Sequence, residues 1–296
     1  MTSLVEVGSL AEVDAALYPA GAVLVRGISV RTPGELARAR EVLGYGAAPR
    51  PEKYAETTDF GDEVYSAPEW GADREMCLHH EQAYRTVVPR VLLMACVAAP
   101  ARGGEVLLGD TREVLAGLPA ELVARFRASG WLLERNFRAY FGLAWTVALG
   151  VGDPAQLTAY GDEAAMAVQW RADGSLHTSQ RRAAVLRHPV TGEECWCNDV
   201  GFFSQWSVDE VERKVLLASF GPEGIPFNTA AGDGTPLSAA QWQSVIDAYD
   251  AVTLRVPLGE GDLLVIDNIL IAHGRAPYTG SRQILMALTE PFAHPG

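Results

Sequence analysis

Short segments rich in aliphatic and β-branched residues recur along this chain, and turn-forming residues separate several of them. One such turn is HPVTGEE at 188–194, and another is GEGD at 259–262. Apolar runs of this length, bounded by glycine, proline and aspartate, are typical of strands in a β-sandwich or barrel. The expected strands are 22–28, 90–99, 183–189, 194–199, 252–258, 261–268 and 283–290.

Helix signals gather near the N-terminus and between the strands. Thr32 and Glu35 have the spacing of a capping box, with a proline at the first helical position and a glycine after the last turn. Ser9 and Glu12 have the same spacing ahead of a shorter helix. Because neither a repeat nor a linker is evident, we expect one domain over 1–296, mainly β with helical decoration (α+β). The other expected helices are 118–130, 207–221 and 238–252, besides the one over 32–44.

The charge and cysteine content exclude several classes of protein. A formal net charge of −13 argues against binding to nucleic acid or to an anionic membrane, since both need a basic patch. The longest apolar run, Val91–Ala99, is half the length of a membrane helix, and residues 1–17 lack the pattern of a signal peptide. Four cysteines without C-x-x-C spacing give no disulfide framework, so we expect a reducing cytoplasm.

The stretch MCLHHEQAY at 76–84 holds two histidines and a glutamate within three positions. In a strand, residues two apart point to the same face, so His79 and Glu81 would project together while His80 points away. An imidazole beside a carboxylate forms two-thirds of the 2-His-1-carboxylate arrangement that holds iron(II). The alternative interpretation is the polar end of an ordinary strand.

A third ligand must come from elsewhere in the chain, and His273 stands in the most suggestive surroundings. It follows an apolar strand and an Asp-Asn pair, and Arg275 and Arg282 come soon after it. Arginines placed so closely in a very acidic protein indicate an anion site. The other histidines lie in segments that resemble turns, loops or the terminal tail, namely His177, His188 and His294.

At this point the sequence resembles a known family. LHHEQAY at 78–84, PARGGEVLLGD at 100–110 and DNILIAHGRAPYTGSRQIL at 267–285 are similar to the successive signatures of iron(II)/2-oxoglutarate oxygenases. The nearest group is the taurine dioxygenase-like and clavaminate synthase-like superfamily. AAVLRHPVTGEECWCND at 183–199 also resembles a segment found in amino-acid hydroxylases of natural-product pathways.

The resemblance implies a double-stranded β-helix, or jelly-roll, core with an iron site. His79, Glu81 and His273 match the iron ligands, and Arg282 matches the arginine that pairs with the distal carboxylate of 2-oxoglutarate. Arginine suits this task because its fork can grip a carboxylate with two hydrogen bonds. Arg275 is a second choice for the same role. The implied reaction consumes O2, decarboxylates 2-oxoglutarate and hydroxylates, desaturates or cyclises an unactivated C–H bond.

Two positions refine what the resemblance implies. Halogenases of this superfamily have a small residue where this chain has Glu81, which argues against halogenation. The family usually has threonine in place of Val106, where the hydroxyl helps to hold 2-oxoglutarate. Its loss weakens cosubstrate binding unless another hydroxyl replaces it, and Thr178 and Ser281 are candidates.

The resemblance to amino-acid hydroxylases suggests an amino-acid-like small molecule as substrate, free or tethered to a carrier protein. Arg135, Asn198 and Asp199 are candidates for holding its polar ends.

Two other interpretations remain open. The first is a zinc site made of Cys77, His79, Cys195 and Cys197. The second is a non-catalytic sensor that binds a metal or a 2-oxo acid on the same jelly-roll.

Overall fold

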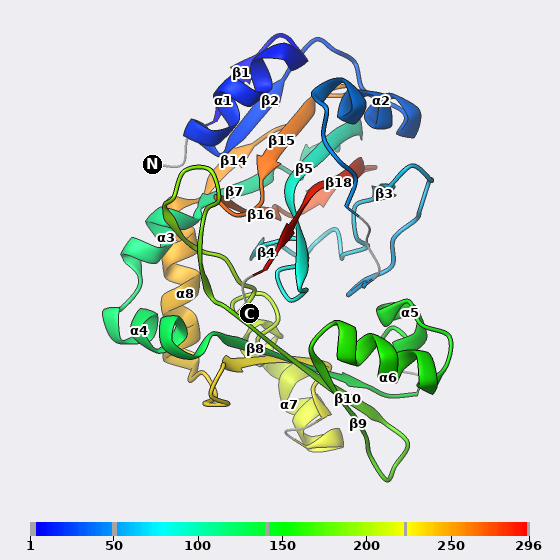
Figure 1. The fold of residues 1–296 in the computed structure, drawn as a ribbon, viewed down its shortest axis with the longest axis vertical. Helices are drawn as coiled ribbons and strands as arrows, with labels where there is room; N and C mark the ends of the chain where they lie inside the picture. Colours follow the sequence, from blue (N-terminus) through cyan, green and yellow to red (C-terminus); the bar gives the residue numbers. More distant parts are fainter. Residues whose placement is uncertain (1–3, 49–51, 140–141, 222–223, 295–296) are drawn as a thin grey trace.

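The computed structural model describes residues 4–48, 52–139, 142–221 and 224–294. Its upper part is a six-stranded sheet in the order β1-β2-β15-β5-β18-β3 (Figure 1). All neighbours in this sheet are antiparallel except β1 and β2. The strands are β1 (Val5–Val7), β2 (Ala22–Val25), β15 (Leu263–Asp267), β5 (Val87–Ala98), β18 (Gln283–Ala293) and β3 (Val64–Ser66).

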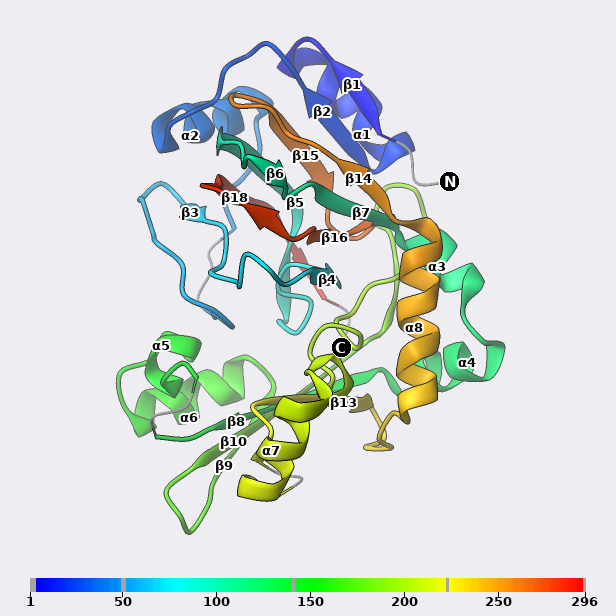
Figure 2. The same cartoon turned by 180° about the vertical axis from the view of Figure 1, so that it is seen from behind.

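A second, four-stranded antiparallel sheet lies against the first in the order β14-β7-β16-β4 (Figures 1 and 2). One apolar cluster joins the two sheets, with Met94, Leu264 and Met286 from the first and Val106 and Leu108 from the second. This arrangement confirms the expected jelly-roll core. The strands are β14 (Leu254–Val256), β7 (Val106–Asp110), β16 (Ile271–Arg275) and β4 (Met76–His79), with β6 (Arg102–Gly103) paired to β17 (Tyr278–Thr279) nearby.

The central strand β5 is buried on both faces, which explains its continuous apolar sequence. Leu92 and Met94 pack into the cluster between the sheets, whereas Leu93 and Ala95 pack on the opposite face. This alternation follows from the two-residue period of a strand. On the outer face two helices cover the sheet, α1 (Val13–Ala20) and α2 (Pro33–Leu43).

The lower part of the molecule contains a third sheet that the sequence analysis did not predict. Its strand β10 is polar at every position after the first, and β8 has only a short apolar start, so both lack the longer apolar runs that marked the other strands. His177 therefore lies on β10 and not in the expected loop. The sheet order is β13-β8-β10-β9, with bounds Phe227–Ala231, Trp131–Phe137, Leu176–Arg182 and Met166–Trp170.

Helices lie around this third sheet (Figure 2), whereas one hairpin packs against α3 (Thr111–Gly117) and the apolar cluster of the jelly-roll. Three helices occupy ranges where the sequence predicted them, α4 (Ala120–Ser129), α7 (Glu210–Phe220) and α8 (Ala239–Val252). The hairpin joins two predicted strands, β11 (Val185–Arg187) and β12 (Glu194–Trp196). Three short helices were not predicted, α3 (Thr111–Gly117), α5 (Trp145–Leu149) and α6 (Pro154–Glu163).

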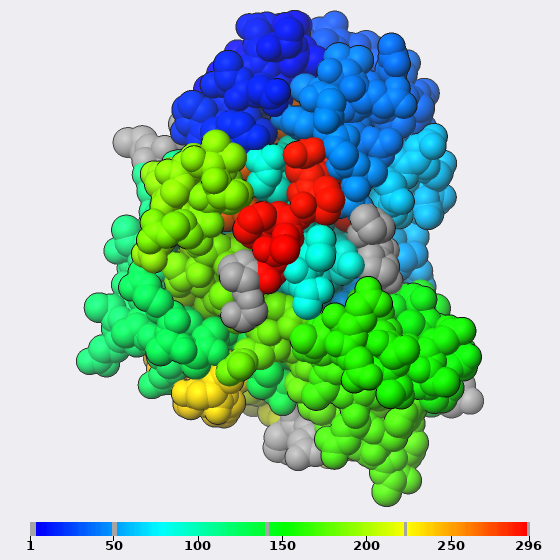
Figure 3. Space-filling view, in the orientation of Figure 1, coloured from blue at the N-terminus to red at the C-terminus, as the bar shows by residue number. Residues whose placement is uncertain are grey.

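Figure 3 shows the C-terminal residues, in red, at the surface between the N-terminal part in blue and the lower part in green. Within the described residues, none of the helices combines the length and apolarity that a membrane crossing requires. The four cysteines are free.

The two predicted capping boxes have different outcomes. Thr32 accepts a hydrogen bond from the Glu35 amide, and the Glu35 side chain accepts one from the Thr32 amide, which confirms the box on α2. The prediction for Ser9 was wrong. A 3-10 turn, Leu10–Glu12, follows Ser9, whose hydroxyl donates to the Glu12 carboxylate and caps no amide.

We therefore expect Thr32→Ala to lower the free energy of unfolding by about 1 kcal/mol, since it removes a cap bond from α2. Ser9→Ala is the matched control and should change that energy by less than about 0.5 kcal/mol. Urea unfolding monitored by circular dichroism measures both. Equal losses in the two variants would contradict this view of α2.

Candidate metal centre

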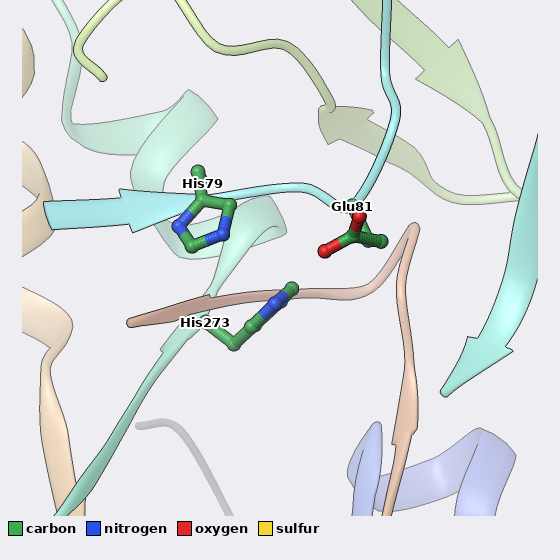
Figure 4. Close-up of side chains that lie close together, drawn as sticks. All are labelled: His79, Glu81 and His273. Carbon is green, nitrogen blue, oxygen red and sulfur yellow. The ribbon is translucent and has the colours of Figure 1, made fainter. Parts of the chain in front are cut away.

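Two histidines lie side by side on neighbouring strands of the second sheet. The antiparallel register of β16 and β4 places His273 directly opposite His79, and their ring centroids are 4.5 Å apart. Glu81 follows shortly after the end of β4, and Figure 4 shows its carboxylate directed towards both rings. One ligand atom from each of the three side chains lies within 4.8 Å of the others, and all three residues are buried. The structure thus brings together the three residues selected from the sequence.

Glu81 reaches this position through a turn, which differs from the expected strand alternation. Strand β4 ends at His79, and Gln82 has a positive φ of 59°. Asn268 fixes the turn, because its Oδ1 accepts from the Glu81 amide at 2.9 Å. Its Nδ2 donates to the carbonyls of Glu81 at 3.0 Å and Pro89 at 2.8 Å. Sequence reasoning assigned no role to Asn268, although its place just before the distal histidine strand was a usable signal.

His80 is directed away from the three candidate ligands, as expected. Its Nδ1 lies 3.2 Å from the Asn198 carbonyl, and its amide donates to Asp199 Oδ1 at 2.8 Å. Burial lowers the pKa of His80 to about 3, so the ring is neutral. Asn198 and Asp199, predicted to hold the substrate, instead contact the segment that carries the candidate ligands.

The donor set fits iron(II). Two imidazoles and one carboxylate leave coordination positions open and are typical of non-haem iron oxygenases. His79 Nδ1 lies 2.9 Å from the Cys77 carbonyl, a contact that orients the ring and leaves Nε2 for a metal. Among the residues that the structure describes, no other group of three or more His, Cys, Asp or Glu side chains could hold an ion. The cysteine-containing zinc site is therefore not formed.

A cavity of about 570 Å³ opens beside these three side chains, and it contains the predicted anion site. Arg282 lines it and donates through Nε to the Gly104 carbonyl at 3.1 Å. Burial, together with the nearby charge of Arg275, lowers the pKa of Arg282 to about 10, so it remains a cation at neutral pH. Val106 is on the same lining. A partly buried arginine of this kind suits a carboxylate ligand.

Arg275 lines the cavity too, but its guanidinium is engaged by the main chain. It donates to the carbonyls of Gly71 and Arg74 at 2.6 Å each, and to that of Trp70 at 3.4 Å. These bonds hold segment 70–74 at the edge of the cavity. The arrangement favours Arg282 over Arg275 as the partner of a ligand carboxylate.

The hydroxyls suggested as replacements for the missing threonine lie elsewhere. Thr178 is fully buried on β10 in the lower sheet, and Ser281 is exposed, and neither lines the cavity. Thr178 belongs to a different sheet, and Ser281 is exposed to solvent although it directly precedes Arg282 in the chain. Other polar side chains do line the cavity. Tyr278 and Gln283 are close to Arg282 in the sequence, and Ser66 lies on β3, which pairs with β18.

Arg135 forms a buried ion pair and does not line the cavity. Its guanidinium donates to Glu52 at 2.7 Å and to the Lys53 carbonyl at 2.8 Å. The hydroxyl of Tyr160 donates to the other oxygen of Glu52 at 2.7 Å. The network fixes the start of the segment that carries Tyr54, whose hydroxyl lies 3.5 Å from His79 Nε2. Arg135 was expected to bind substrate, but strand β8 directs it to this loop.

Comparisons of the sequence with known proteins identify relatives that match most of the chain. The chain is 31% identical over 279 residues to dapdiamide synthesis protein DdaC of Enterobacter agglomerans, covering 94% of this chain and 85% of that one. It is 25% identical over 286 residues to a clavaminate synthase-like protein of Arabidopsis thaliana, covering 93% and 83%.

Solved structures share the fold. One is a putative alpha-ketoglutarate-dependent taurine dioxygenase from Burkholderia xenovorans, with a TM-score of 0.54, 16% identity, and coverage of 99% of this chain and 93% of that one. Another is PvcB, an Fe, alpha-ketoglutarate dependent oxygenase, with a TM-score of 0.53, 14% identity, and coverage of 98% and 85%. The family model of the taurine catabolism dioxygenase TauD, TfdA family matches residues 3–289. The chain therefore belongs to the TauD/TfdA family and is an iron(II)- and 2-oxoglutarate-dependent dioxygenase.

Proposed function

We propose that this dioxygenase hydroxylates, desaturates or cyclises an unactivated C–H bond of an amino acid or an amino-acid-derived natural-product intermediate, free or bound to a carrier protein. The observation that carries the proposal is the cluster of His79, Glu81 and His273 beside a cavity that also contains Arg282. The 31% identical relative is named for the synthesis of dapdiamide, which supports a natural-product pathway. Among family members we place the chain nearest to amino-acid hydroxylases of such pathways.

The proposed roles follow from the side chains. His79, Glu81 and His273 hold iron(II), and Arg282 binds the distal carboxylate of 2-oxoglutarate with Val106 as part of the wall. When bound, iron and 2-oxoglutarate supply the oxidation by O2 that breaks the C–H bond.

The remaining work of the chain is positioning and the exclusion of water. The Cys77 carbonyl orients the His79 ring, and Asn268 sets the backbone of Glu81. The ring of Phe202 stacks on His79 at 4.5 Å between centroids and covers it from the lower part of the molecule. Apolar cover of this kind excludes water from the His79 ring and lowers the local dielectric there.

Two further proposals concern the setting of the enzyme. Residues 1–296 form one oxygenase domain, which is supported by Phe202 of the lower part packing on a candidate ligand of the jelly-roll. A reducing cytoplasm is the proposed location, in keeping with four free cysteines.

Metal binding provides the first test of the assigned roles. His79→Ala and His273→Ala should each weaken the affinity for cobalt(II), a redox-stable substitute for iron, by more than about 100-fold. Even mutation of a residue that only hydrogen-bonds to a metal ligand typically lowers metal affinity by about 10–100-fold. Isothermal titration of the metal measures this affinity. His80→Ala is the control, and it should lower the melting temperature through lost packing while the affinity changes little. Metal binding that survives loss of His79 but not of His80 would overturn the assignment.

A second test concerns the cosubstrate. Arg282→Ala should raise the KM for 2-oxoglutarate by on the order of 100-fold, because a buried charge that loses its partner costs about 3–5 kcal/mol. Val106→Thr adds a hydroxyl to the same lining and should lower this KM several-fold, corresponding to roughly 1 kcal/mol. Steady-state succinate formation gives both constants. An unchanged KM in Arg282→Ala would make Arg275 the anchor, and an unchanged KM in Val106→Thr would mean that another group already binds the carboxylate.

The substrate class is tested by a mass-spectrometric screen. Free amino acids and carrier-bound aminoacyl thioesters are incubated with the enzyme, iron(II), 2-oxoglutarate, ascorbate and air. We expect a product heavier by one oxygen atom or lighter by two hydrogens, formed only when 2-oxoglutarate is present. Oxidation of a non-amino-acid compound with no turnover of either amino-acid class would contradict the proposal.

A further inference from the structure

A second, smaller cavity of about 150 Å³ lies beside the metal cavity. Most of its lining is apolar, and Ser204, Ser207 and Glu212 are the polar members. Tyr54 and Trp70 line both cavities, so the two adjoin. The remaining wall of the smaller cavity comes mainly from the lower part of the molecule. We call this space the apolar pocket, defined by Phe202, Phe203, Leu216, Ile225 and Phe227 together with the two shared residues.

A side chain of the apolar pocket is in direct contact with a proposed iron ligand. Phe202, which lines the pocket, stacks on His79 with 4.5 Å between centroids and 23° between ring planes. Its ring also contacts Trp70 at 5.4 Å and Tyr54 at 5.5 Å. The aromatic side chains of Tyr54, Trp70 and Phe202 thus lie at the boundary between the apolar pocket and the metal cavity.

The lining selects what the pocket can hold. Phe203 stacks on Phe227 with 5.0 Å between ring centroids, and Leu216 and Ile225 are almost fully buried. A charged group would lose its hydration there, whereas an apolar group gains free energy from leaving water. An apolar cavity of about 150 Å³ is large enough to bind benzene. The pocket thus fits a phenyl ring or a branched aliphatic chain.

Helix α7 closes the outer side of the apolar pocket. Leu216 is the one residue of this helix, within the described residues, that is buried, and it lines the pocket. An ion pair of 3.6 Å joins Glu212 of α7 to Arg74, in the segment that Arg275 holds at the edge of the metal cavity. Figure 2 shows α7 beside β13, where Phe227 begins the strand. The one buried side chain that this helix contributes thus lies on the wall of the pocket.

We infer that the apolar pocket is the specificity pocket of the active site, and that the substrate is an amino-acid derivative whose apolar side chain, of phenyl or branched aliphatic size, occupies it. This inference rests on the proposed function and adds the class of side chain. Leu216 and Phe227 set the size that is accepted, and the substrate extends past Tyr54 and Trp70, which line both cavities.

Fluorobenzene tests the pocket directly, because its 19F signal reports binding without turnover. The wild type and the variants are loaded with zinc(II) and 2-oxoglutarate and titrated with this probe. We expect saturable binding by the wild type and by Leu216→Ala, and binding at least about tenfold weaker in Leu216→Trp, whose indole fills the space. Leu217→Trp is the matched control, since it changes the neighbouring position of α7, which does not line the pocket, and should bind as the wild type does. Melting temperatures verify that each variant is folded.

Displacement of the bound probe then tests the substrate class. Leucinamide and phenylalaninamide should displace fluorobenzene at concentrations at least about tenfold lower than alaninamide does, since they bury several more methylene groups. Probe binding that persists in Leu216→Trp, or equal displacement by the three amides, would overturn the inference.

Turnover separates this inference from the function on which it rests. Succinate formation stimulated by alanine derivatives but not by leucine or phenylalanine derivatives would overturn the specificity pocket and leave the proposed function intact. Amides that displace the probe while no amino-acid derivative, free or carrier-bound, stimulates succinate formation would instead overturn the proposed function.

Discussion

The antiparallel pairing of β16 with β4 is the constraint on which the rest of the site depends. It sets His273 opposite His79, so the proposed iron ligands meet although almost two hundred residues separate them in the chain. Strand β16 is held in turn by β7, whose first residue Val106 lies on the cavity wall. A shift of one residue in this register would direct the imidazole to the opposite face of the sheet. The buried apolar cluster between the two sheets opposes such a shift.

Features that are local in the sequence could be predicted from it. The HxE pattern suggested His79 and Glu81, and the resemblance to the oxygenase family added His273 as the third ligand and Arg282 as the partner of the 2-oxoglutarate carboxylate. Strand β5 was evident because both of its faces are buried and its sequence is continuously apolar. Helix α2 was evident because Thr32 caps it within four residues. Each of these signals is contained in a short segment.

Features that arise from contacts between distant segments could not be predicted. The lower sheet was missed because β10 is polar at every position after Leu176 and its buried side chains there are themselves polar, while β8 contains a polar run. Only the pairing of these strands with their neighbours reveals the sheet. Arg135 was assigned to the substrate because nothing in its surroundings in the sequence reveals Glu52, its buried partner 83 residues away. The apolar pocket likewise combines side chains from loops, α7 and β13 that share no motif. The residues proposed to select the substrate therefore lie in segments that carry no recognisable sequence motif.

The central claim is that His79, Glu81 and His273 hold iron(II) beside an arginine-anchored 2-oxoglutarate. An anaerobic titration of the iron(II) enzyme with 2-oxoglutarate, followed by visible absorption, tests it most directly. The account predicts a weak charge-transfer band that requires both components and is absent from His273→Ala. It also predicts that Arg282→Ala needs far more 2-oxoglutarate to reach the same absorbance. A folded wild-type enzyme that binds iron(II) but develops no such band at saturating 2-oxoglutarate would contradict it.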